Sequence, residues 1–318
     1  MANASPIRGH HHMTLCVGTP QEDYRFHVNA LGLRNVKKTV LFDGPVPIYH
    51  LYYGNDVGSE SSLLTTFPFR ADGRKARPGS GQVKTVSLAV NEDAIPYWEK
   101  RLPQHGHAVK KIERFGTTRL VFYHPSGIEY ELVGSPEDPR KPWVGADVPQ
   151  ECAIYGTYGI TVAARDAGEM HSFMDEAMGF TNSGSEKGDT HFHVGKGLPG
   201  QVVEVLHTPD LPQGSWTYGE GSVHHVAFDV AGDQAQKEYK DYLEGMGFTD
   251  VSDQKNRNYF MSVYFRTPAG ALFEAAYTLG DAFLTDETYE NLGAVIQLPP
   301  WMEEKREEYL SKLEPIFE

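Results

Sequence analysis

The residues best suited to chemistry are three potential metal ligands that lie far apart in the chain. His12 opens an apolar strand-like run, His225 lies in the run 223–230, and Glu274 lies in the closing run 271–277. Two neutral imidazoles and one carboxylate on one face leave adjacent coordination positions open, as in iron(II) enzymes that bring a substrate and dioxygen together. A closed zinc site would need a fourth ligand. The pattern therefore predicts an open metal site.

The segments that must position these ligands form a repeat. Each copy has an apolar strand, an amphipathic helix that ends in a glycine-containing turn, and later strands that close with an aromatic and acidic run. The copies open near residues 13, 85, 159 and 223, and we expect their helices over 21–30, 94–102, 168–178 and 234–245. The predicted fold class is therefore α+β, with four βαβββ modules forming two domains.

A segment rich in Pro, Asp and Lys, residues 135–150, marks the best domain boundary. We expect an N-terminal domain of modules one and two over 1–140 and a linker over 141–153. A C-terminal domain of modules three and four would follow over 154–280, and then a tail over 281–318. Within this tail, residues 299–318 carry mixed charge and predict a surface helix.

Strand alternation decides which residues share a face with the ligands. His12 shares its face with Thr14, and His225 lies at the equivalent place in the fourth copy. Copies two and three carry Thr85 and Gly159 at these places, so they lack the ligand. Copies one and four should therefore share one site across the domain boundary.

Other titratable residues receive structural interpretations. We expect Glu129, Glu131 and Glu204 to be structural, and His10 to lie in an exposed loop. The two cysteines of the chain do not require a disulfide, which fits a reducing compartment.

Composition excludes some partners. The 29 Lys and Arg against 43 Asp and Glu give a net charge of −14, which disfavours nucleic acid and anionic membrane surfaces. The apolar runs are short, and the N-terminus lacks the apolar core of a signal peptide. We therefore expect a cytoplasmic protein.

Several specific strings point to one family. They are Val-Lys-Lys-Thr-Val at 36–40, Tyr-His-Leu-Tyr-Tyr-Gly at 49–54, Thr-Thr-Phe-Pro at 65–68, Gly-Glu-Gly at 219–221 and Val-His-His-Val at 223–226. With these strings and the triad, nearly the whole chain resembles the hydroquinone-type ring-cleaving dioxygenases of the vicinal oxygen chelate superfamily, whose fold is glyoxalase-like. The resemblance implies iron(II), an aromatic small-molecule substrate and O2. It leaves manganese(II) and a homo-oligomeric state open.

The resemblance also implies five catalytic residues around the metal. These residues are His11, Thr14, His224, Arg257 and Tyr264. Alternation predicts that His11 and His224 face away from the metal unless the strands are irregular. The run 264–274 also resembles the signature of catechol-cleaving enzymes, which have a histidine where this chain has Arg257. This departure favours the hydroquinone branch.

Three alternatives remain open at this point: an extradiol catechol dioxygenase, a glyoxalase-like metal lyase or isomerase that works without oxygen, and a module that binds small molecules without a metal. We further expect Phe67, Tyr259 and Phe273 to line the substrate pocket.

Overall fold

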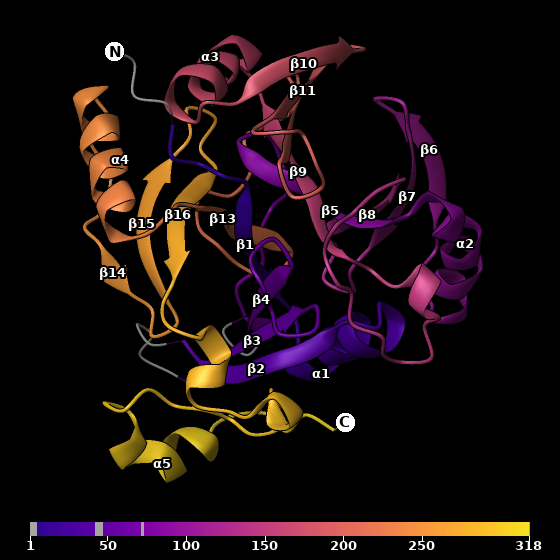
Figure 1. The fold of residues 1–318 in the computed structure, drawn as a ribbon, viewed down its shortest axis with the longest axis vertical. Coiled ribbons are helices and arrows are strands. Elements are labelled where there is room, and N and C mark those ends of the chain that lie inside the picture. The colour runs from indigo at the N-terminus through magenta and orange to yellow at the C-terminus, as the bar shows by residue number, and fades with distance from the viewer. Residues whose placement is uncertain (1–4, 42–46, 71–72, 318) are drawn as a thin grey trace.

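The computed structural model describes residues 5–41, 47–70 and 73–317, and these form two curled eight-stranded sheets (Figure 1). The first sheet consists, in spatial order, of β14 (Lys255–Asn256), β15 (Phe260–Arg266), β16 (Leu272–Thr278), β13 (Ser222–Asp229), β1 (His10–Val17), β4 (Leu63–Pro68), β3 (Tyr49–Gly54) and β2 (Arg34–Val40). The second consists of β10 (Thr181–Glu186), β11 (Asp189–His193), β12 (Val202–His207), β9 (Gly156–Ala164), β5 (Gln82–Asn91), β8 (Glu129–Ser135), β7 (Thr117–Tyr123) and β6 (Lys110–Arg114).

One helix follows the opening strand of each repeat. These helices are α1 (Pro20–Tyr24) with its π-helical continuation η1 (Arg25–Ala30), α2 (Ile95–Gln104), α3 (Ala167–Ser172) with η5 (Phe173–Ala177), and α4 (Asp233–Gly245). A last short helix, α5 (Arg306–Leu310), and the 3-10 turns η3 (Glu92–Ala94), η4 (Gln150–Cys152), η6 (Ala282–Thr285), η7 (Tyr289–Asn291) and η8 (Glu303–Lys305) complete the described helices. The predicted α+β fold of four βαβββ units is confirmed.

Local sequence explains where these helices form. Helix α1 begins at Pro20, directly after Thr19, whose side chain accepts a hydrogen bond from the Glu22 amide and so caps the helix. Helix α4 buries Tyr239 and Leu243, which lie four residues apart on one face, and it packs on β15 and β16. None of the helices in the described part of the chain is long and apolar enough to span a membrane.

The pairing of the sheets joins the two ends of the chain. Strand β1 of the first unit pairs antiparallel with β13 of the fourth, while β5 of the second unit pairs antiparallel with β9 of the third. Each sheet therefore combines strands from both halves of the chain, and the opening strands of units one and four lie side by side. The predicted domain boundaries stay a prediction.

Strand β1 separates core from cavity by alternation. Met13 and Leu15 belong to the main hydrophobic core, whereas His12 and Thr14 line a cavity on the other face. The same alternation along β16 sends Phe273 into the core, where its ring packs on Phe228 at 4.8 Å between centroids. The first sheet thus has one apolar face and one face whose side chains line the cavity.

One prediction outside the site is wrong and another holds in part. His10 is not in an exposed loop; it is the first residue of β1 and is buried, with its amide donating to the Gly200 carbonyl and its ring packed against Phe228. The surface helix predicted over 299–318 is present only as η8 and α5, which end before Pro315. Residue 318 lies outside the described residues.

Candidate metal centre

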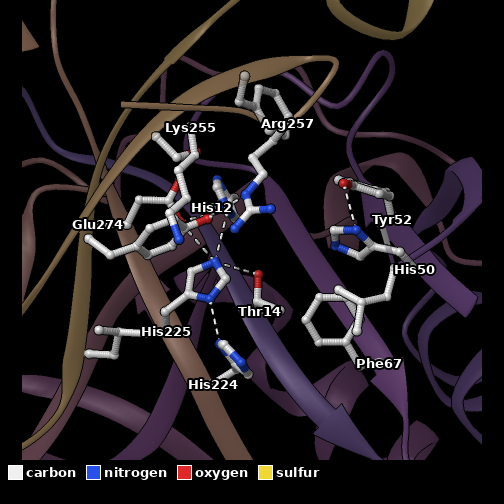
Figure 2. A pocket seen from close by; sticks show the side chains of 15 residues that line it. His12, Thr14, His50, Tyr52, Phe67, His224, His225, Lys255, Arg257 and Glu274 are labelled. Atoms are coloured by element: carbon white, nitrogen blue, oxygen red, sulfur yellow. Dashed lines mark hydrogen bonds and ion pairs between the residues drawn. The ribbon is translucent and has the colours of Figure 1, made fainter. Parts of the chain in front are cut away.

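The three predicted ligands meet on adjacent strands of the first sheet. His12 lies on β1, His225 on the neighbouring β13, and Glu274 on β16 beyond it. The Nε2 atoms of the two histidines are 3.3 Å apart, and the Glu274 Oε2 atom lies 3.0 Å from His225 Nε2 and 3.7 Å from His12 Nε2 (Figure 2). All three side chains are buried.

The charge states of His12, His225 and Glu274 fit a bound cation. Burial lowers the pKa of His12 well below its usual range and, with the nearby Arg257 charge, lowers that of His225 to about 3, so both imidazoles are neutral at pH 7. The Nδ1 atom of each faces a neighbouring histidine. Neither carboxylate oxygen of Glu274 has a hydrogen-bond donor among the described residues, although the side chain is fully buried. A buried carboxylate beside two ring nitrogens is unfavourable without a positive charge between them, so this donor set fits a divalent metal.

Two β-bulges bring His11 and His224 to these ligands. In the pairing of β1 with β13, His10 faces Phe228 and His12 faces Ala227, so His11 is an extra residue; a second shift leaves His224 extra. Because a bulge redirects its side chain, His11 Nδ1 reaches His12 Nδ1 at 2.9 Å, and His224 Nδ1 reaches His225 Nδ1 at 2.8 Å. The irregular strands therefore override simple alternation.

The triad forms part of the wall of a cavity of about 380 Å³. Its other lining residues are Thr14, Leu41, His50, Tyr52, Phe67, His224, Lys255, Arg257, Phe260, Ser262, Tyr264 and Leu272. Of the three aromatic residues expected here, Phe67 is present. Tyr259 and Phe273 are not, because the Tyr259 hydroxyl binds Asp286 and Phe273 points into the core. His11 contacts His12 from outside this lining.

Two further predicted residues flank the ligands from β15 and the segment before it. The Tyr264 ring meets the His225 ring edge-on at 5.5 Å between centroids, and Arg257 Nε donates to the Tyr264 hydroxyl at 3.3 Å. Burial raises the pKa of Tyr264, so this side chain keeps its proton at pH 7. Arg257 and Tyr264 thus present a positive charge and a hydroxyl beside His225.

A row of hydrogen bonds runs from the ligands to the far wall of the cavity. Thr14 Oγ1 lies 2.9 Å from His225 Nε2 and 2.7 Å from Thr65 Oγ1, which in turn lies 2.9 Å from His50 Nε2. His50 Nδ1 lies 2.9 Å from the Tyr52 hydroxyl (Figure 2). Sequence reasoning did not identify His50 and Tyr52 as site residues. Their spacing of two along β3 was the available signal, since it places both on one face.

Comparison with known proteins agrees with this geometry. No family model matches the sequence. A chlorohydroquinone/hydroquinone 1,2-dioxygenase of Sphingobium indicum is 38% identical over 314 residues, which cover 98% of this chain and 97% of the relative. MhqO of Bacillus subtilis, named as a ring-cleaving dioxygenase, is 36% identical over 313 residues, 98% of each protein. This chain belongs to the ring-cleaving dioxygenases.

Solved structures place the dioxygenase in the vicinal oxygen chelate fold. A crystal structure of a Bacillus subtilis protein described as a dioxygenase aligns with a TM-score of 0.91 and 35% identity over 98% of each chain. Glyoxalase I from Zea mays aligns with a TM-score of 0.62 at 11% identity, over 87% of this chain and 94% of the other, which shows a shared fold alone.

The second sheet of the dioxygenase carries an arginine cluster at the place equivalent to the triad. Glu274 faces Ala227, two residues after His225; likewise Glu204 faces Thr161, two residues after Gly159. There the fully buried Arg119 guanidinium binds both Glu131 and Glu204. A side-chain cation thus neutralises the carboxylates of this sheet, in agreement with the structural role predicted for these two residues.

A second buried group of potential ligands, Asp23, His27 and His124, is accounted for in part by hydrogen bonds; Asp23 Oδ1 and His124 Nε2 have no hydrogen-bond partner among the described residues. Asp23 Oδ2 accepts from the Tyr53 and Thr66 hydroxyls at 2.8 and 2.6 Å. The amide two residues after His124 donates to its Nδ1 at 3.0 Å, so the neutral ring carries its proton on Nε2, which lies 3.2 Å from Asp23 Oδ1. His124 therefore has no ring nitrogen left for a metal.

Proposed function

We propose that the enzyme is an iron(II)-dependent dioxygenase that opens the ring of hydroquinones at the bond next to a hydroxyl group. The observation that carries the proposal is the convergence of His12, His225 and the hydrogen-bond-free Glu274 on the wall of a largely aromatic and apolar cavity of about 380 Å³. The name of the Sphingobium relative, a chlorohydroquinone/hydroquinone 1,2-dioxygenase, supports the same reaction.

Three protein ligands leave room for both reactants. Iron(II) bound at these residues would hold a ring hydroxyl and dioxygen side by side and carry electrons between them. Manganese(II) accepts the same ligand types, so measurement must decide the metal.

The residues around the three proposed ligands have different proposed roles in the reaction. Thr14 and Tyr264 place hydroxyl groups beside His225, where they can donate to a reacting oxygen, and the Arg257 charge stabilises negative charge that develops there. His224 lines the cavity, and its Nδ1 would accept from the Nδ1–H of a metal-bound His225, so its ring proton is on Nε2 and this ring can donate to an oxygen of the substrate. His11 orients His12.

The far wall suits the second oxygen of a para-diol. The two oxygens of hydroquinone lie at opposite ends of the ring, so one points away from the metal when the other is bound. His50 and Tyr52 lie on the side of the cavity away from Glu274, beside Phe67, and form a polar pair there (Figure 2). The second oxygen of a catechol would instead lie next to the first. We therefore propose that this pair binds the distal hydroxyl of a hydroquinone.

The test is oxygen uptake by iron-loaded protein with hydroquinone, chlorohydroquinone and catechol. We expect fastest uptake on a hydroquinone, none with His225→Ala, and full activity with His207→Ala, an exposed histidine in the second sheet. Faster uptake on catechol would indicate an extradiol enzyme. Turnover of a substrate without oxygen would indicate a lyase or isomerase, and ligand binding without a metal requirement would indicate a binding module.

A further inference from the structure

A second chain of hydrogen bonds begins at His12 Nδ1. This ring nitrogen lies opposite the Nε2 atom that faces His225 and Glu274. His12 Nδ1 lies 2.9 Å from His11 Nδ1, and His11 Nε2 lies 3.0 Å from the Thr278 hydroxyl. That hydroxyl donates to Glu60 Oε1 at 2.6 Å. The chain thus joins β1 to the end of β16 and to the loop before β4.

Each hydrogen bond in this chain has only one possible direction from donor to acceptor. Glu60 Oε1 accepts from the Thr278 hydroxyl and is the acceptor at which the chain ends. The Thr278 hydroxyl must then donate to Glu60 and accept from His11 Nε2–H. With its ring proton on Nε2, His11 accepts through Nδ1 from His12 Nδ1–H. The Nε2 lone pair of His12 is left for the metal.

We propose that Thr278 and Glu60 are positioning residues of the metal centre, which act through His11 to fix the tautomer and ring orientation of His12. The inference rests on the proposed metal site. Metal-binding histidines commonly donate their second N–H to an acceptor that orients them, and loss of this support weakens metal binding. Here the acceptor is two residues further away than in a direct histidine–carboxylate pair.

The second proposed histidine ligand, His225, is held by different contacts. His225 contacts His224, whose ring stacks on Tyr218 at 3.8 Å between centroids. The carboxylate-terminated chain therefore belongs to His12. Glu60 also lines a separate cavity of about 220 Å³ beside Arg8 and Arg140, so the end of the chain lies in a cavity distinct from the substrate cavity.

The experiment is a Co²⁺ titration of metal-free full-length protein, followed by visible absorption and by competition with a chelator. Thr278→Val removes the hydroxyl while it keeps the shape of the side chain. We expect it to weaken Co²⁺ binding by about 10- to 100-fold and to change the absorption spectrum, whereas Thr278→Ser restores both. The matched control is Thr267→Val, in the same hairpin. Its buried hydroxyl has no hydrogen-bond partner among the described residues, so Co²⁺ affinity should not change.

A double variant tests whether the two residues act in series. Glu60→Gln introduces an amide that can also donate, so it should weaken Co²⁺ binding less than Thr278→Val does. Once Thr278→Val has cut the chain, adding Glu60→Gln should cause no further loss. Equal Co²⁺ affinity of the Thr278→Val and Thr267→Val proteins, or additive losses in the double variant, would overturn this inference alone. A wild-type protein that bound no Co²⁺ would overturn the metal centre as well.

Discussion

Replacing Arg119 by methionine should strongly destabilise the second sheet. The Arg119 side chain is fully buried, and its Nη1 atom lies 3.1 Å from Glu131 Oε2 and 3.1 Å from Glu204 Oε2. Its Nη2 atom lies 2.6 Å from Glu204 Oε1. Methionine fills much of the same space without the charge. The variant therefore keeps two buried carboxylates with Arg114 as their remaining cationic partner in this cluster.

The size of the effect follows from these contacts. Hydrogen bonds to charged groups contribute about 1.5–3 kcal/mol each, so three would amount to roughly 5–9 kcal/mol if nothing relaxed. A carboxylate left unpaired can take up a proton, and water can enter, so breaking a buried ion pair costs about 3–5 kcal/mol. We expect a loss of about 3–5 kcal/mol in the free energy of unfolding. Arg114→Met should cost less, because this arginine is partly exposed, at 17% of its side chain.

The assay is urea unfolding at pH 7, followed by circular dichroism. Adding Glu131→Gln and Glu204→Gln should recover part of the loss at pH 7. A loss below about 1 kcal/mol, the usual range of an exposed ion pair, would refute the reasoning.

Three further predictions concern the substrate cavity, the metal ligands and acid stability. Tyr52→Phe should raise KM for hydroquinone by about 3- to 10-fold, because one hydrogen bond is lost, and should have little effect on KM for catechol. Oxygen uptake kinetics that show the same change in KM for both substrates would contradict the proposed role. Glu274→Gln should abolish Co²⁺ binding in calorimetry, whereas Glu204→Gln, at the equivalent place in the second sheet, should retain it. Thermal stability should fall as the pH drops below about 6.5, and further below about 4. Burial lowers the pKa of His124. The nearby His27 and close contacts with His124 and His27 outweigh burial and lower the pKa of Asp23, so the unfolded chain binds protons that the folded protein does not. A melting temperature that stays constant from pH 7 to 4 would exclude this.

The repeat made much of the fold and the triad predictable. A period of two along each strand, applied to four equivalent segments, was enough to select His12, His225 and Glu274, because equivalent places in a repeat fold to equivalent places in space. The helices followed from their periodicity and turns. The same alternation correctly sent Met13 and Leu15 to the opposite face.

What could not be predicted depends on pairing between distant strands. A bulge adds one residue against the partner strand, so the placement of His11 and His224 depends on the register between β1 and β13. The role of His50 requires knowing that β3 and β4 extend the sheet beside β1. Glu60 and Thr278 are 218 residues apart in sequence, and no local pattern links them.

Because the first and fourth units form one sheet, the proposed site can assemble only after the fourth unit has been synthesised. His12 leaves the ribosome 213 residues before His225, which at about 5–20 residues per second is an interval of roughly 10–40 s. Until the last unit has been translated, strand β1 lacks the neighbour that completes its ligand set. A chain that ends before Glu274 therefore cannot assemble the proposed metal centre, which confines its chemistry to molecules in which the fourth unit has been translated.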